Sequence, residues 1–500
     1  MQRGVAYCAP FAVVTGILVG DASGPGPAVE VLVVGFALAG ASVLARSGVA
    51  RAVLLVVALA LLGCALERRA VDGLTSGEIV AAADARADAT VVASVTDDPD
   101  GFRWSTRMLV SVDRARVRMP DGRALDVREH RTVLVVAEGD AAGRVAVLGA
   151  GDRVVLRGWL RPLEDYDQRL RWRHAVARLD ALELLDATES ESPLATVANG
   201  ARAITLRGTD VLEPTERALV AGFLLGDTRD LPDPIVERFR DAGLSHLLAV
   251  SGANVAFVLA LIGPLLRRTG RGTRLVATFA TLLVFGAMTR WEPSVLRACA
   301  MAATAVLAAH LGRPAQGVRV LALAAALLLL VDPFLVRSVG FLLSCGASLG
   351  IALLAGPIAR RLRGPAWLRE SLGTTVAAQV GVAPVLLPVF GSVPLVSLPA
   401  NLLAVPLAGP LTTWGLTGGV IAGVVRSRAP ALAELLQVPT RVLSQALLGL
   451  ADLTGSVPLA VDAGDVATGG AAALVGVAAV VVLRARRRML RERALVVPPR

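Results

Sequence analysis

The sequence predicts a polytopic α-helical membrane protein of about 12 spans, with a small extracytoplasmic OB-like β-barrel domain inserted after the third span. Three observations carry this prediction. Hydrophobic residues make up 54% of the 500 residues, charged residues make up 18%, and the mean hydropathy is +0.63. Apolar runs of roughly 20 residues alternate with short Arg-rich turns. Residues 67–200 interrupt them with one long polar stretch.

The net charge of +10 is distributed unevenly between the polar stretch and the apolar regions. Residues 67–200 contain 19 Arg against 23 Asp and Glu, so the polar stretch is slightly acidic. The surplus of Arg lies in the turns between apolar runs, where it indicates membrane topology rather than a general affinity for nucleic acid. All four cysteines lie in apolar runs, which argues against a disulfide framework or a cysteine zinc site.

Residues 1–66 predict three transmembrane helices, at 5–20, 29–45 and 49–66. The first run is also long enough for a signal peptide, but residues 20–24 lack a small-x-small cleavage site. Arg46 and Arg51 place the second turn in the cytoplasm, which puts the N-terminus inside and residues 67–200 outside. Arg68 and Arg69 argue against this orientation, because they would lie just outside the third span.

The polar stretch predicts strands at 89–95, 104–112, 132–136, 144–148 and 152–160. Each run is short, rich in β-branched residues and bounded by Asp-Pro, Asp-Gly or Gly. Five strands favour a closed barrel of the OB type.

Residues 201–242 predict an amphipathic helical connector, residues 243–484 a transmembrane domain, and residues 485–500 a basic cytoplasmic tail. The expected spans are 243–266, 274–289, 295–311, 319–331, 338–356, 372–390, 396–424, 432–452 and 468–484. This division places every Arg cluster in the cytoplasm, including the C-terminus. Residues 384–410 hold six prolines, too many for one straight helix, and a broken helix in a bilayer indicates a pathway.

The polar residues of the transmembrane domain predict a transport path. If residues 243–266 form one helix, His246, Ser251 and Asn254 share one sector and face the bundle interior. Hydrogen bonding between helices is the alternative reading of these three. Arg297 lies about one turn inside a span, where a charge needs a partner or water. Four further path candidates are Asp332, Ser344, Gln379 and Asn401; for Asp332, before Pro333, a turn-initiating role is the alternative.

The polar stretch also offers a surface for single-stranded nucleic acid. Arg114, Arg116 and Arg118 alternate along residues 112–119 and would share one face of a strand, and Trp104 could stack on a base. A charged edge strand that resists aggregation is the alternative interpretation.

Nothing in the sequence predicts an enzyme. The four histidines fall in different segments, so no metal site is expected, and without Lys there is no phosphate-binding loop ending in Gly-Lys. On one helix, His246 and Ser251 would diverge by roughly 140°, which argues against an intramembrane hydrolase. We therefore expect no catalytic residue and no cofactor.

Four blocks of sequence resemble the ComEC family of competence proteins. They are Phe239-Arg240-Asp241-Ala242-Gly243-Leu244-Ser245-His246-Leu247-Leu248-Ala249-Val250-Ser251-Gly252, Pro293-Ser294-Val295-Leu296-Arg297-Ala298, Asp332-Pro333-Phe334 with Gly340-Phe341-Leu342-Leu343-Ser344, and Asn401-Leu402-Leu403-Ala404-Val405-Pro406. The three N-terminal spans and the external β-domain are similar to that family as well. The resemblance implies an inner-membrane channel that passes one strand of incoming DNA into a bacterial cell during natural transformation.

The resemblance also implies partners. These are single-stranded DNA, the lipid bilayer, a DNA receptor, and a separate cytosolic motor or nuclease; the oligomeric state stays open. Many family members have Leu-His where this chain has Ala253 and Asn254, and many continue into a metallo-β-lactamase-like domain. No His/Asp cluster follows the last predicted span, so a separate protein would degrade the second strand. A transporter or exporter of a small molecule or lipid precursor is the alternative function.

Overall fold

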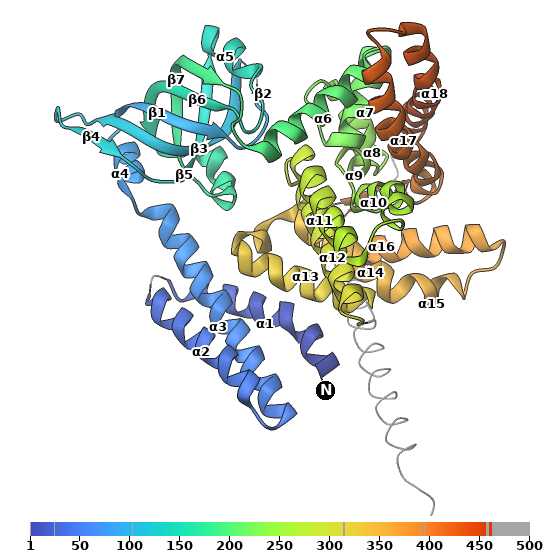
Figure 1. The fold of residues 1–500 in the computed structure, drawn as a ribbon, viewed down its shortest axis with the longest axis horizontal. Helices are drawn as coiled ribbons and strands as arrows, with labels where there is room; N and C mark the ends of the chain where they lie inside the picture. Colours follow the sequence, from blue (N-terminus) through green and yellow to red (C-terminus); the bar gives the residue numbers. More distant parts are fainter. Residues whose placement is uncertain are drawn as a thin grey trace, which may run out of the picture.

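The computed structural model describes residues 2–456, except 25, 103, 314–315, 391 and 395, together with residues 460–462. Most of this chain is helical, and one β-rich domain forms a separate lobe (Figure 1). Helical segments lie at each predicted span within these ranges, but the span predicted at 243–266 is divided between two helices. The predicted span at 468–484 and the tail at 485–500 lie outside the described residues.

The N-terminal region is a bundle of three helices, α1 (Gln2–Ala22), α2 (Ala28–Leu44) and α3 (Gly48–Thr75). Small residues let α1 and α3 approach to backbone contact. A Cβ atom on Gly16 would lie 1.9 Å from the Ala60 carbonyl oxygen, so only glycine fits there. After α3, the short helix α4 (Glu78–Asp84) leads into the β-domain.

The β-domain is a mixed seven-stranded sheet. Its strands are β1 (Asp88–Val95), β2 (Asp100–Phe102), β3 (Ser105–Arg118), β4 (Ala124–Val127), β5 (Arg131–Glu138), β6 (Arg153–Arg161) and β7 (Ala175–Thr188). Pairing runs β1–β6–β7–β5–β3, and β3 pairs with β1 in turn, so the series of pairings returns to its first strand. Only β5 and β7 pair in parallel. Apolar side chains from these five strands fill one core.

The strand predictions for this domain need correction, because one predicted strand is a helix and the strands β2, β4 and β7 were not predicted. The strand expected at 144–148 is wrong, because residues Gly139–Ala146 form helix α5. Ala141 and Val145 are both buried, and a spacing of four places them on one face of a helix. Strand β7 was not predicted, because its Ala-, Leu- and Glu-rich sequence has helical propensity that pairing with β5 and β6 overrides.

The rest of the described chain is helical, apart from the short paired strands β8 and β9. After η1 (Asp165–Arg173) and β7 come α6 (Pro193–Thr209), α7 (Pro214–Leu225), α8 (Asp233–Asp241), α9 (Ser245–Leu248), α10 (Gly252–Leu266), α11 (Arg271–Met288), α12 (Pro293–His310), α13 (Gly317–Val331), η2 (Pro333–Arg337), α14 (Val339–Gly350), the π-helical η3 (Ile351–Ala355), α15 (Gly356–Ala359), α16 (Ala366–Phe390), β8 (Ser392–Pro394), α17 (Ser397–Val425), α18 (Pro430–Gly455) and β9 (Ala460–Asp462). Helix α7 is buried almost entirely, at the centre of the largest helical core. The proline-rich segment at 384–410 is divided between α16 and α17.

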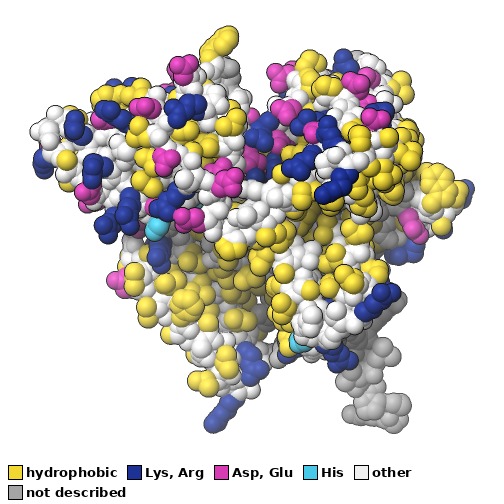
Figure 2. All heavy atoms as spheres, turned by 45° about the horizontal axis from the view of Figure 1, so that its top comes forward, with side chains coloured by type: hydrophobic (Ala, Val, Ile, Leu, Met, Phe, Trp, Pro, Cys, Tyr) yellow, Lys and Arg dark blue, Asp and Glu magenta, His cyan; other side chains and the backbone are white. Residues whose placement is uncertain are grey.

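The described helices have the surface of a membrane protein. Five are long and apolar enough to cross a bilayer: Gly48–Thr75, Pro293–His310, Val339–Ala359, Ala366–Phe390 and Ser397–Val425. Four shorter apolar helices accompany them, Ala6–Ala22, Ala28–Leu44, Gly252–Leu266 and Gly317–Val331. Figure 2 shows acidic side chains gathered over the two upper lobes, and hydrophobic side chains over the lower surface. Several apolar helices therefore indicate a multi-pass membrane protein.

Candidate functional site

The segment that carries His246, Ser251 and Asn254 is a broken helix. The single helix expected over 243–266 is wrong, because α9 ends at Leu248 and α10 begins at Gly252. Ala249 and Ser251 between them have extended backbone, with ψ of 146° and 156°. The shared helical sector predicted for the three polar residues therefore does not exist.

Hydrogen bonds with two other helices, α12 and α7, hold the break open. Ser294, at the start of α12, donates a hydrogen bond to the Val250 carbonyl group, which has no helical donor at this point. The Asn254 amide nitrogen donates to the Phe223 carbonyl oxygen of α7 at 2.8 Å, and the Ser251 hydroxyl lies 3.1 Å from the Asn254 amide oxygen. The break is thus a fixed feature of the fold.

Arg297 lies directly beside this break. Its side chain is buried, with 8% of its surface exposed. The Arg297 Nε atom donates to the Ser344 hydroxyl of α14 at 2.6 Å, and Nη1 lies 3.0 Å from the Met301 sulfur. A Cβ atom on Gly252 would lie 2.7 Å from Arg297 Nη2, so glycine at the first position of α10 leaves room for the guanidinium group.

Arg297 and the N-terminus of α10 together concentrate positive charge beside the break. The first N–H groups of a helix have no helical acceptors and carry the positive end of its dipole. Ser251 does not cap α10, since its hydroxyl lies against Asn254 instead. In the described ranges, no Asp or Glu oxygen lies within 4.0 Å of the Arg297 guanidinium nitrogens. Ser251, Gly252, Arg297 and Ser344 together form what we call the anion site, because this chemistry suits an anion.

Two predicted path residues lie apart from the anion site. His246 is on α9, before the break, and its side chain is exposed. Asp332 accepts a hydrogen bond from the Phe334 amide at 3.0 Å, which caps η2. The other contact of Asp332 is with the β-domain, 3.3 Å from His174 Nε2. The structure therefore has Asp332 both starting a turn and touching the β-domain.

Gln379 and Asn401 form a second polar group with Ser397. The Gln379 amide donates to the Ser397 hydroxyl at 3.0 Å, and the Asn401 amide donates to the Ser397 carbonyl oxygen at 2.8 Å. Gln379 is on α16, which packs along α14, the helix of Ser344, at backbone contact. A Cβ atom on Gly381 would lie 2.2 Å from the Gly346 carbonyl oxygen. The two polar groups thus belong to neighbouring helices, without a hydrogen bond between them among the described residues.

Arg114, Arg116 and Arg118 share one exposed face of β3, as their alternation predicts. We call these three residues the arginine strip. Arg116 is paired with Asp126 of β4 at 3.1 Å, but both side chains are more than three-quarters exposed, at 77% and 76%, so the pair is weak. The strip therefore presents accessible guanidinium groups.

Trp104 does not belong to the same surface. It is 91% exposed at the turn before β3, ten residues from Arg114, which is roughly 30 Å along an extended strand. The outer face of β3 and β5 nearest to Trp104 is covered by a second apolar cluster, in which Leu109 and Leu134 pack against Leu163 of the segment leading to η1. A strand of nucleic acid that contacts both Trp104 and the arginine strip would have to pass around this covered face.

The described residues contain no group of three or more His, Cys, Asp or Glu side chains that could hold a metal ion. Sequence reasoning missed four contributors to the site: Gly252, Ser294, Met301 and Ser397. Met301 follows Arg297 by one helical turn, so its contact was within reach of the sequence. The contacts of the other three depend on how separate helices pack.

Known proteins match the part of the chain that contains this site. A sequence profile described as "Competence protein" matches residues 223–488. The chain is similar to "ComE operon protein 3" of Bacillus subtilis (strain 168), with 27% identity over 268 residues, which cover 52% of this chain and 32% of the relative. It is also 27% identical over 212 residues to "Uncharacterized protein YcaI" of Escherichia coli (strain K12), covering 39% and 28%. The match therefore spans about a third of each relative's length, and no solved structure matches.

Proposed function

The chain belongs to the competence protein family, and from this premise we propose that it conducts one strand of DNA across the bacterial inner membrane during natural transformation. The observation that carries the proposal is the anion site. A buried arginine without an acidic partner among the described residues, beside an uncapped helix N-terminus, is what a passing phosphate group requires.

The physical argument concerns the cost of desolvating phosphate. A strand of DNA carries one negative charge per nucleotide, and a bare charge in hydrocarbon is very costly. The broken helix provides free N–H groups at membrane depth, and Arg297 provides a fixed cation that replaces part of the lost hydration. We infer that successive phosphates exchange at this site, with the second polar group of Gln379, Ser397 and Asn401 lining the same route.

In this proposal the β-domain receives DNA on the outer side of the membrane. The return of strand pairing from β3 to β1, with one parallel pair, fits a five-stranded OB-like barrel. The proposed topology has 12 spans with both termini in the cytoplasm, which keeps the Arg clusters inside. We propose that the chain acts as a conduit and not as an enzyme, and that a motor pulls the strand while a nuclease removes its complement.

Uptake in living cells tests the proposal. A strain lacking this chain is compared with the same strain complemented by it, and labelled double-stranded DNA is followed into a nuclease-protected compartment. Restored uptake supports a conduit. If the parent strain takes up DNA and the deletion changes nothing, the conduit fails, and export of a small molecule or lipid precursor becomes the leading function.

The arginine strip yields a prediction for DNA binding. Replacing Arg114, Arg116 and Arg118 by Gln is expected to weaken binding of single strands by the full-length chain in detergent. Three lost phosphate contacts should also lower the slope of log Kd against log salt concentration by about 2. The measurement is a titration of fluorescent oligonucleotide at several salt concentrations.

The matched control for this prediction removes three charges elsewhere on the same domain. Arg153, Arg157 and Arg161 are exposed on β6, and each already pairs with a carboxylate, Glu191, Asp88 and Asp180 respectively. Their replacement by Gln should leave the salt slope nearly unchanged. Equal effects of the two triple variants would mean that only overall charge matters and that the strip is not a binding surface.

A further inference from the structure

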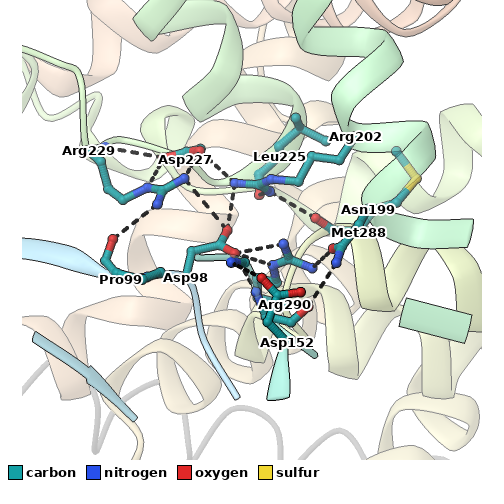
Figure 3. Close-up of polar contacts among 12 residues, drawn as sticks. Asp98, Pro99, Asp152, Asn199, Arg202, Leu225, Asp227, Arg229, Met288 and Arg290 are labelled. Carbon is teal, nitrogen blue, oxygen red and sulfur yellow. Dashed lines mark hydrogen bonds and ion pairs between the residues drawn. The ribbon is translucent and has the colours of Figure 1, made fainter. Parts of the chain in front are cut away.

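A buried cluster of charges joins the β-domain to the helical domain, and none of its members belongs to the anion site. Asp98 follows β1, Arg202 is on α6, Asp227 and Arg229 follow α7, and Arg290 follows α11. Figure 3 shows these five side chains converging from separate elements. We call them the ionic joint.

The contacts of the joint are short and well defined. One Asp98 oxygen accepts from Arg290 Nη2 at 2.7 Å, and the other lies 2.9 Å from Arg202 Nη2. Arg202 Nη2 also pairs with Asp227 at 2.6 Å. Arg229 pairs with Asp227 at 2.7 Å and donates to the Pro99 carbonyl oxygen at 3.0 Å (Figure 3). The β-domain therefore contributes acceptors, and the helical domain contributes the arginines that need them.

Burial makes these contacts strong. Asp98, Arg202 and Asp227 have side chains that are 12%, 7% and 9% exposed. Burial raises the pKa of Asp227, but the hydrogen bond and charge of Arg229 and the charge of Arg202 outweigh it and lower that pKa to about 2. Burial likewise opposes ionisation of Asp98, and Arg290 and Arg202 hold its pKa below 3.8. Because both pKa values are lowered, each carboxylate stabilises the folded state above its ordinary pKa, and this stabilisation is lost as the pH falls through the lowered pKa, which for Asp227 is about 2.

One route leads from Asp98 to Arg297 through the turn between α11 and α12. Arg290 and Trp291 in this turn both have φ of 54°, an unfavourable backbone for residues other than glycine, which needs support from its surroundings. Arg290 supplies that support by bonding Asp98 and, at 2.8 Å, the Asn199 amide oxygen. Since α12 begins at Pro293, three residues after Arg290, the bond from Arg290 to Asp98 lies close to the start of the helix that carries Arg297.

A second series of contacts leads from Asp98 to the start of α10, which is the other part of the anion site. Arg202 Nη1 donates to the Met288 carbonyl oxygen at 3.0 Å and lies 3.4 Å from that of Leu225, at the end of α7. The carbonyl group of Phe223 on α7 accepts the Asn254 amide, which holds the start of α10. The two halves of the anion site are thus connected to one carboxylate of the β-domain.

We propose that Asp98 is a positioning residue, through which the β-domain sets the placement of Arg297 against the N-terminus of α10. The ionic joint then works as a mechanical link between the domain that receives the substrate and the site that it must pass. The inference rests on the proposed function only in placing the anion site on the DNA path. The link itself is a property of the apo protein and is testable without DNA.

Native cysteines provide the test. Cys345 follows Ser344, the partner of Arg297, whereas Cys64 is buried on α3 in the N-terminal bundle. Two chains are made, each keeping one of these cysteines and with the other three replaced by Ala. In membranes without DNA, Asp98→Asn is expected to raise the rate of Cys345 modification by a permeant maleimide roughly fivefold, through local opening of the site. The Cys64 rate should stay constant.

Two controls separate linkage from general damage. Asp98→Glu keeps the charge, so Cys345 should again be modified almost as slowly as in the parent chain. Asp121→Asn removes an exposed carboxylate of the same domain that pairs with Arg123, and it should leave both rates unchanged. An unchanged Cys345 rate in Asp98→Asn, or equal rises at Cys345 and Cys64, overturns the proposal. If Asp98→Asn does not accumulate in membranes, Asn199→Ala replaces it, because Asn199 is the uncharged side chain that bonds Arg290. The rates of Cys345 and Cys64 modification are then compared in the same way. DNA uptake that is unchanged by deletion of the chain would instead count against the proposed function, and it would leave the maleimide result as it stands.

Discussion

Replacing Arg297 by alanine is expected to lower DNA uptake by about tenfold to a hundredfold. A hydrogen bond to a charged group contributes about 1.5–3 kcal/mol, and 1.4 kcal/mol corresponds to a factor of ten in rate. The loss falls on passage and not on folding, because in the part of the chain that the structure describes the guanidinium group has no acidic partner that would be left behind. Uptake of labelled DNA is measured at matched protein abundance in the membrane.

Two further variants sharpen this prediction. Arg297→Lys keeps the charge but cannot reproduce the contacts with both Ser344 and Met301, so an intermediate uptake is expected. Arg361→Ala removes an exposed arginine at the end of α15 and should leave uptake near the parent level. Normal uptake by Arg297→Ala would remove this residue from the path and leave the proposed function without its main support.

Substitution of Gly423 by alanine is expected to destabilise the protein by at least about 1–3 kcal/mol. A Cβ atom there would lie 2.0 Å from the Ile204 carbonyl oxygen, and one on Gly208 would lie 1.9 Å from that of Gly419. Both obstacles are backbone atoms, so α6 and α17 would have to separate. Thermal unfolding of the purified chain in detergent, and its abundance in membranes, measure the effect.

Gly449 supplies the control for the packing prediction. It also lies inside a helix, α18, but a Cβ atom there would meet nothing within 4 Å. Gly449→Ala should therefore be neutral or stabilise the protein by up to about 1 kcal/mol. If Gly423→Ala is as stable as Gly449→Ala, then α6 and α17 do not pack as described.

The elements predicted from the sequence are those set by local pattern. Apolar runs between Arg-rich turns predict helices because a backbone in hydrocarbon must satisfy its own hydrogen bonds. Helices lie at these runs in the described ranges, although the run at 243–266 is divided between α9 and α10. Alternation predicts the shared face of Arg114, Arg116 and Arg118 on β3. The competence family follows from short motifs around Gly252 and Arg297, and the sequence profile confirms it.

Errors arise where distant contacts decide the structure. The helix expected through Ser251 breaks because Ser294, from another helix, takes the Val250 carbonyl group. Strand β7 has a helical composition and is a strand because β5 and β6 pair with it. Asp98 and Arg290 are 192 residues apart, and no local pattern relates them. The ionic joint therefore could not be predicted from the sequence.

Crosslinking from inside the bundle to an incoming strand tests the central claim most directly. A photoreactive amino acid replaces Met301, which touches Arg297, or Leu323, which is 40% exposed on the outside of α13. Cells taking up labelled DNA are illuminated, and the purified chain is examined for covalently attached single strands. A conduit past Arg297 predicts attachment at position 301 and none at 323. Attachment at neither position during active uptake, or equally at both, would contradict a path through the anion site.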